Sequence, residues 1–142
     1  MPAPVLLAPV DEQQFAEEDD IILTWQPVGT LPPNAFYVVT LAYLHGTDTW
    51  YDDTPWIRDT SWAASEHRYL LDLSTDSLFH WSVRVMLRTG FDANGRPVGR
   101  PLSPASEVRT FSWVKANGGV TPPPADTPAP TPTPTKPPPP TP

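Results

Sequence analysis

The residues that could do chemistry in this chain gather in one stretch, Trp50-Tyr51-Asp52-Asp53-Thr54-Pro55-Trp56, with a further tryptophan close behind it. Exposed aromatic rings stack on sugar rings while carboxylates accept hydrogen bonds from sugar hydroxyls, and the same aromatic types anchor protein interfaces. Alternate aromatic residues in short strands also fit ordinary core packing, which a domain without disulfides needs. These three interpretations stay open for one candidate binding surface: Trp50, Tyr51, Asp52, Asp53, Trp56 and Trp62.

Four aspartates in and around this stretch have oxygen atoms of the kind that Ca²⁺ prefers: Asp48, Asp52, Asp53 and Asp59. Calcium takes about six to eight oxygen ligands, usually from one flexible loop with a recognisable spacing. The spacing of these aspartates matches no calcium-loop motif. We therefore expect solvated carboxylates and no metal site.

The sequence contains none of the short motifs that mark hydrolases, zinc proteases or phosphate-binding loops. Its three histidines, His45, His67 and His80, are not in a metal-ligand spacing, and the chain has no cysteine to act as a nucleophile or thiolate ligand. No carboxylate stands out as one of a catalytic pair. The sequence thus predicts a non-catalytic protein that needs no cofactor.

The bulk composition excludes two classes of partner. The net charge is −7, whereas nucleic-acid binding requires clustered lysine and arginine, so no nucleic-acid partner is expected. No apolar run approaches the ~18 residues of a membrane span, so no direct membrane insertion is expected.

The longest regular pattern is the alternation over Phe79–Arg88. Its odd positions are all apolar, and its even positions are polar apart from Met86. A period of two is typical of a strand with one face buried and one face in water. This stretch is therefore predicted to be a long central strand of a sheet.

The other elements expected along the chain are short strands joined by turns. Strands are predicted at Val5–Ala8, Ile21–Gln26, Phe36–Leu44, within Thr47–Trp62 on both sides of a turn at Asp52–Pro55, at Tyr69–Leu73 and at Glu107–Val114. Loops are predicted at Asp11–Asp20, with Phe15 as an anchor, and at Thr89–Ala105, with Asn94-Gly95 as its tightest turn. About seven strands and no convincing helix predict an all-β fold, an antiparallel immunoglobulin-like β-sandwich.

Several pieces of the pattern resemble a fibronectin type III module, over residues 4 to 114. They are the early edge Pro4–Pro9, Leu23-Thr24-Trp25, Tyr37-Val38-Val39, Trp81-Ser82-Val83-Arg84-Val85 where the family has Tyr-x-Val-x-Val, and Leu102–Ser106 before the last strand. The chain looks most similar to the divergent bacterial versions of secreted and surface proteins. This resemblance implies an extracellular or cell-surface protein.

Composition divides the chain into a β-sandwich domain, 1–115, and a tail, 116–142. The tail is nearly all Pro, Thr, Ala and Gly and has no aromatic residue, so it cannot build a core. Such sequence favours polyproline II and acts as a semi-rigid linker or stalk. A ligand for a proline-recognition domain is the alternative.

The function that these features favour is a non-catalytic extracellular structural or interaction module, serving as a spacer, in adhesion or in protein–protein contact. Its partner is expected to be another protein or further copies of itself. A second hypothesis is a subunit of a cell-surface filament whose tail packs on neighbouring copies. The third is a carbohydrate-binding module that uses exposed aromatic residues to hold a glycan.

Overall fold

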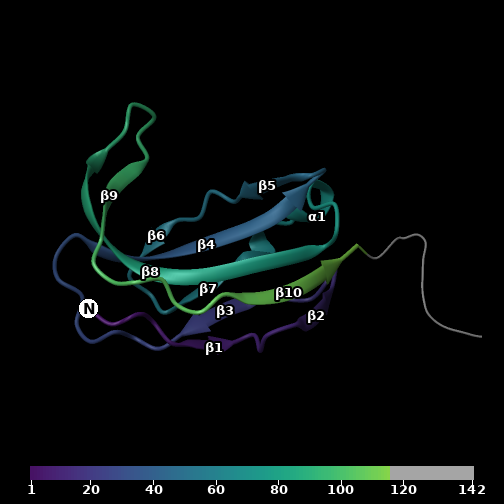
Figure 1. The fold of residues 1–142 in the computed structure, drawn as a ribbon, viewed down its shortest axis with the longest axis horizontal. Helices are drawn as coiled ribbons and strands as arrows, with labels where there is room; N and C mark the ends of the chain where they lie inside the picture. Colours follow the sequence, from purple (N-terminus) through teal and green to yellow (C-terminus); the bar gives the residue numbers. More distant parts are fainter. Residues whose placement is uncertain (116–142) are drawn as a thin grey trace, which may run out of the picture.

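Two β-sheets face each other across a layer of buried side chains in the computed structural model, which describes residues 1–115 (Figure 1). The smaller sheet has three strands, in the order β1 (Leu6–Ala8), β3 (Ile22–Trp25), β7 (Ser61–Ala63). The tail predicted over 116–142 lies outside the described residues.

The larger sheet has seven strands. Five of them follow one path, β2 (Gln13–Ala16), β10 (Arg109–Val114), β8 (Leu78–Phe91), β4 (Ala35–His45) and β5 (Asp48–Tyr51). Two more lie off this path: β6 (Trp56–Ile57) pairs with β4, and β9 (Pro97–Pro101) pairs with β8. The all-β sandwich expected from the sequence is confirmed, with ten strands among residues 1–115 in place of about seven.

The predicted central strand lies within β8, and its alternation is confirmed. Phe79, Trp81, Val83 and Val85 are all buried, while the residues between them are half-buried on the other face. Strand β8 pairs antiparallel with β4 from Leu87 opposite Ala35 to Phe79 opposite Tyr43. Opposite residues in a pair share a face, so the two strands present one continuous apolar surface to the small sheet.

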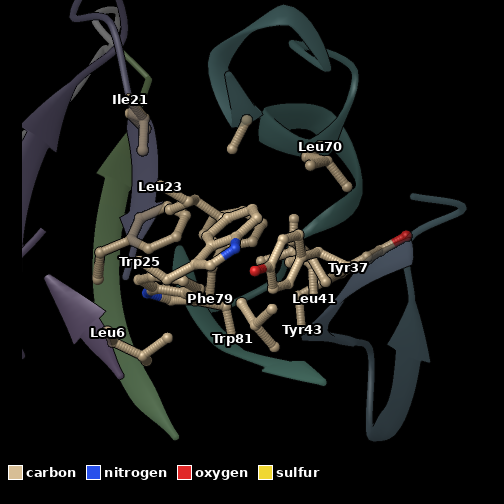
Figure 2. Packing of buried hydrophobic residues seen from close by; sticks show 14 of the residues in the cluster. Leu6, Ile21, Leu23, Trp25, Tyr37, Leu41, Tyr43, Leu70, Phe79 and Trp81 are labelled. Atoms are coloured by element: carbon tan, nitrogen blue, oxygen red, sulfur yellow. The ribbon is translucent and has the colours of Figure 1, made fainter. Parts of the chain in front are cut away.

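Aromatic side chains from both sheets fill the space between them. Figure 2 shows Trp25 of the small sheet among Phe79, Trp81 and Tyr37 of the large sheet. The Trp25 and Tyr37 ring centroids are 5.7 Å apart. The indole N–H groups of Trp25 and Trp81 have no hydrogen-bond partner among the described residues. Each unpaired group costs about 1–3 kcal/mol, so the packing must contribute more than that.

Strand β2 occupies the middle of the loop expected between Asp11 and Asp20, four of its ten residues. The expected anchor is present, since the Phe15 ring packs edge-on against Phe111 at 5.8 Å. The segment around this anchor is a strand, however, and it pairs parallel with β10, with Phe111 opposite Gln13. Four mostly exposed residues at a sheet edge carry too little apolar alternation to be recognised from sequence.

The strand expected at Tyr69–Leu73 is wrong. This segment is one helical turn, α1 (Leu70–Leu73), preceded by a 3₁₀ turn at Ala64–Glu66. Both Leu70 and Leu71 are buried. Adjacent residues of a strand point to opposite faces, whereas a helical turn can place two neighbouring leucines against the same core. The segment closes one end of the sandwich between β7 and β8.

The loop expected at Thr89–Ala105 is in part a hairpin, formed by the end of β8 and by β9. Its turn lies where Asn94-Gly95 predicted it, with Gly95 at a φ of +81°. Gly99 passes so close to β8 that an added Cβ would lie 1.8 Å from the Leu87 carbonyl oxygen. Figure 1 shows this hairpin projecting from the body of the larger sheet. The close approach at Gly99 helps to set how the hairpin leaves the sheet.

Two buried serines, Ser103 and Ser106, lie in the segment that connects β9 to β10. The amide N–H of Val85 donates to Ser103 Oγ and that of Val83 donates to Ser106 Oγ, each at 2.9 Å. The Ser106 amide in turn donates to the Val83 carbonyl oxygen. Serine side chains thus replace the backbone acceptors that a continuous strand would supply to β8.

We expect Trp81→Ala to lower the free energy of unfolding by about 3–5 kcal/mol, because it removes a large aromatic side chain that is 1% exposed. Met86→Ala, on the opposite face of the same strand, is the matched control and should cost far less. Urea denaturation of the three proteins measures both differences. Equal losses in the two variants would mean that the faces of β8 are assigned the wrong way round.

We expect Ser106→Ala to cost about 1–3 kcal/mol, because it leaves the buried Val83 N–H without its acceptor. Ser82→Ala, on the outer face of β8, provides the control and should stay within about 0.5 kcal/mol of the parent protein. Thermal and urea unfolding report the difference. A Ser106→Ala protein as stable as the Ser82→Ala protein would refute the bridging role of this hydroxyl.

Candidate functional site

Five of the six residues of the candidate binding surface lie in β5, in β6 or in the connection between them, at one edge of the larger sheet, and Trp62 lies in β7 of the smaller sheet. Trp50 lies opposite Tyr43, whose side chain belongs to the core, and Tyr51 lies opposite Ala42 on the outer face. Neighbouring residues of a strand point to opposite faces, so Trp50 and Tyr51 cannot serve one flat platform.

The exposure of the aromatic residues also differs. Trp50 is 41% exposed and Tyr51 67% exposed, while Trp56 and Trp62 are half-buried. Trp62 packs against the core, so the core-packing interpretation fits it. The Trp50 ring stacks on His45 with a centroid separation of 3.8 Å. Trp56 lies opposite Val38 on the outer face and contacts Phe36 at 6.4 Å.

Asp52 belongs to a cluster that the sequence pattern did not predict. One of its carboxylate oxygens, Oδ2, lies 2.6 Å from Nδ1 of His67, and the other, Oδ1, accepts a hydrogen bond of 2.5 Å from the Tyr69 hydroxyl. The Asp52 side chain is 2% exposed and that of His67 is 25% exposed. A carboxylate without its proton can only accept, so we assign the neutral imidazole proton to Nδ1, which leaves Nε2 as an acceptor.

Three segments hold this cluster together. The Asp52 amide donates to the Leu41 carbonyl oxygen at 2.9 Å, which extends the β5 pairing by one residue and points the carboxylate inward. The 3₁₀ turn positions His67, whose amide donates to the Ala64 carbonyl oxygen. Trp62 of β7 packs edge-on against the His67 ring at 5.0 Å. The imidazole is therefore fixed by its carboxylate partner and by an aromatic wall.

The surroundings of Asp52 keep two nearby phenols, Tyr69 and Tyr43, protonated. Burial raises the pKa of Tyr69 well above its usual value of 10.0, and the hydrogen bond to Asp52 raises it further. The pKa of Tyr43 is raised as well. Burial is the larger cause, and the nearby negative charge of Asp52 is the smaller one. Tyr69 consequently acts as a hydrogen-bond donor to Asp52 over the whole physiological pH range.

An open groove of about 570 Å³ lies beside the cluster. It runs between the connection from β5 to β6 and the turn of the β8–β9 hairpin, and His67 forms part of its wall. The hairpin turn is tied to the opposite side by an ion pair of 3.2 Å between Arg96 and Asp53. Nine residues line the groove: Asp53, Thr54, Pro55, Trp56, His67, Asp92, Gly95, Arg96 and Pro97.

The groove lining brings an imidazole, two carboxylates, a guanidinium and an indole ring to one surface. A carboxylate that orients an imidazole also occurs in hydrolases, where the imidazole activates a hydroxyl. The one hydroxyl in the lining is that of Thr54, and it donates to the Val39 carbonyl oxygen. Among residues 1–115 no group of three or more His, Cys, Asp or Glu is placed to hold a metal ion.

Of the six predicted residues, Asp53 and Trp56 line the groove and Asp52 supports it from behind. Trp50 and Tyr51 lie on the β5 edge outside the lining, and Trp62 contacts it only through His67. Sequence reasoning missed His67, Tyr69 and Arg96. The separations of 15 and 17 residues between Asp52 and its two partners follow no local period, so no sequence signal pointed to them.

Comparison of the chain with protein-family models, with curated proteins and with solved structures finds no match. Within the described part of the chain, no helix has the length and apolar character needed to cross a bilayer.

We expect Tyr69→Phe to make the protein less sensitive to alkali. In the parent protein the unfolded state ionises Tyr69 near pH 10, while the folded state keeps the proton, so the stability that this phenol contributes is present below pH 10 and is lost as the pH rises above it. Without the hydroxyl, the free energy of unfolding should fall less steeply above pH 10.

Urea denaturation at a series of alkaline pH values measures that slope. Tyr51→Phe is the control, because Tyr51 lies outside the cluster and is 67% exposed, against 48% for Tyr69. Parallel curves for the parent and Tyr69→Phe proteins would contradict a shifted pKa at Tyr69.

Proposed function

We propose that this chain is a non-catalytic, fibronectin type III-like module that acts as a structural spacer and contact element outside the cell. The strand arrangement supports the family resemblance. Immunoglobulin-like sandwiches place the first, second and fifth strands in one sheet and the third, sixth and seventh in the other. Here β1, β3 and β7 form one sheet, and β4, β8 and the interrupted β9–β10 lie in the other.

The observation that carries the spacer role is the position of the two ends of the domain. The Met1 amino group donates to the Leu102 carbonyl oxygen, and Leu102 bonds to Val85, far along β8. At the other end, the Trp113 amide donates to the Ser77 carbonyl oxygen, just before β8 begins. The ends therefore lie about one strand length apart, as Figure 1 shows. A module of this form extends a chain when it is placed in series.

The pairing of β2 with β10 supports the same role. These strands are close to the two ends of the domain, and they run parallel with four residue pairs in register. Pulling the ends apart would slide one strand along the other and load these pairs together, in place of opening them one at a time. Phe15 against Phe111 and the Glu12 amide on the Thr110 carbonyl oxygen reinforce the contact.

The extracellular location and the protein partner rest on the resemblance and on the Thr/Pro composition of the tail. The filament alternative depends on how residues 116–142 pack on other copies, and those residues lie outside the described part of the chain. The present proposal needs only the sandwich.

We expect the full chain to resist force more strongly when it is pulled through its two ends than through its N-terminus and position 94. The first geometry shears β2 against β10 along its length, whereas the second pulls β2 away from β10 starting at its N-terminal end. Asn94→Cys provides a unique attachment point because the chain has no cysteine. Single-molecule force spectroscopy of the two attachments measures the difference.

The parent protein should unfold through its ends in one cooperative step. Phe15→Ala should lower the force more in that geometry, because the four β2–β10 pairs that Phe15 supports resist together there. Equal unfolding forces in both geometries would refute the spacer proposal.

A further inference from the structure

The groove is supported by a buried carboxylate, that of Asp52, whose burial costs stability and is not needed to form the sandwich. Burying a carboxylate is unfavourable unless charged or hydrogen-bonding partners replace the lost water. Asp52 is buried and has both oxygens occupied, by His67 and Tyr69. These contacts fix one imidazole ring in the wall of an open groove. Preorganised binding sites typically use a buried polar side chain, here Asp52, to fix a partly exposed one, here His67.

The opposite wall is fixed in a similar way. Asp92 Oδ1 accepts hydrogen bonds from the Asn94 amide at 2.8 Å and from the Arg96 amide at 3.0 Å, which sets the shape of the hairpin turn. The Arg96 guanidinium then reaches Asp53 across the groove. The side chain of Arg96 remains 62% exposed, so its other N–H groups are available to a ligand.

The lining combines an indole with donors and acceptors at short range. Trp56 supplies an apolar surface, Asp53 and Asp92 supply acceptors, and Arg96 supplies a planar set of donors. A pyranose ring presents the matching chemistry, with an apolar C–H face and hydroxyls around its rim. Carboxylates in the groove and a net charge of −7 disfavour phosphates and acidic polymers. The open form of the groove suits a chain of sugars.

We propose that this groove binds a neutral saccharide chain, with one sugar ring stacked on Trp56 and its hydroxyls hydrogen-bonded to Asp53, Arg96 and Nε2 of His67. Asp52 and Tyr69 are positioning residues that keep His67 in place. This activity is separate from the spacer role, since neither end of the domain takes part in it. Of the aromatic residues that the sequence marked for sugar binding, Trp56 alone contributes to this site.

The test begins with the full chain on an array of neutral oligosaccharides, including glucans, mannans, xylans and chitin oligomers. At least one series should bind, and affinity should rise with chain length until the groove is filled. The strongest oligosaccharide is then titrated against variants, with tryptophan fluorescence or calorimetry as the readout.

Trp56→Ala and Arg96→Ala should each weaken binding by about tenfold or more, the effect expected of a central anchor. Arg96 lies on an exposed turn, so its variant keeps the fold even if Trp56→Ala proves unstable, and thermal melting checks both. Trp50→Ala is the matched control, an exposed tryptophan outside the groove, and should bind within about twofold of the parent protein.

Three results would overturn the proposal. One is an array on which no neutral glycan binds, and another is binding that only sulfated or uronic acid chains support. The third is a synthetic proline-rich peptide that binds the groove while glycans fail to compete with it. A failure here leaves the force measurements unaffected, so the two proposals stand or fall separately.

Discussion

The structure depends on the burial of one continuous apolar face formed by β4 and β8. Nine residue pairs join these strands in register, and the inward side chains meet Trp25 and Leu23 of the small sheet. A shift of one residue in this pairing would turn every apolar side chain of β8 toward water. The positions of β5, of the β8–β9 hairpin and of the groove between them follow from this register, because β5 pairs with β4 and β9 pairs with β8.

The interruption between β9 and β10 is what allows a groove to form on an otherwise regular sandwich. Ser103 and Ser106 satisfy the amides of β8 where the last strand breaks, so β9 can follow the far end of β8 on its own course. The register shift between Arg88 and Gly90 changes the course of the hairpin further. Its turn reaches the connection between β5 and β6, where Arg96 meets Asp53. One local break in the ladder thus creates the wall of a site.

The sequence predicted the parts of this fold that have a local signature. The alternation of Phe79–Arg88, the turn at Asn94-Gly95 and the short strands on both sides of Asp52–Pro55 all appear where expected. It did not predict α1, since Leu70 and Leu71 fit a buried strand as well as a buried turn, nor the parallel β2, whose residues are mainly polar. The candidate site was found in part, because Asp53 and Trp56 belong to a visible cluster. His67 and Arg96 join the site only through tertiary packing, which the spacing of residues in the sequence does not predict.

The central claim for the site is that Asp52 fixes the tautomer of His67 and leaves Nε2 open to the groove. The ¹⁵N chemical shifts of the His67 ring, recorded at a pH where the imidazole is neutral, test it most directly. We predict a protonated Nδ1 and an unprotonated Nε2 in the parent protein, and loss of this preference in Asp52→Ala. A ring protonated at Nε2, or a tautomer unchanged by Asp52→Ala, would contradict the account.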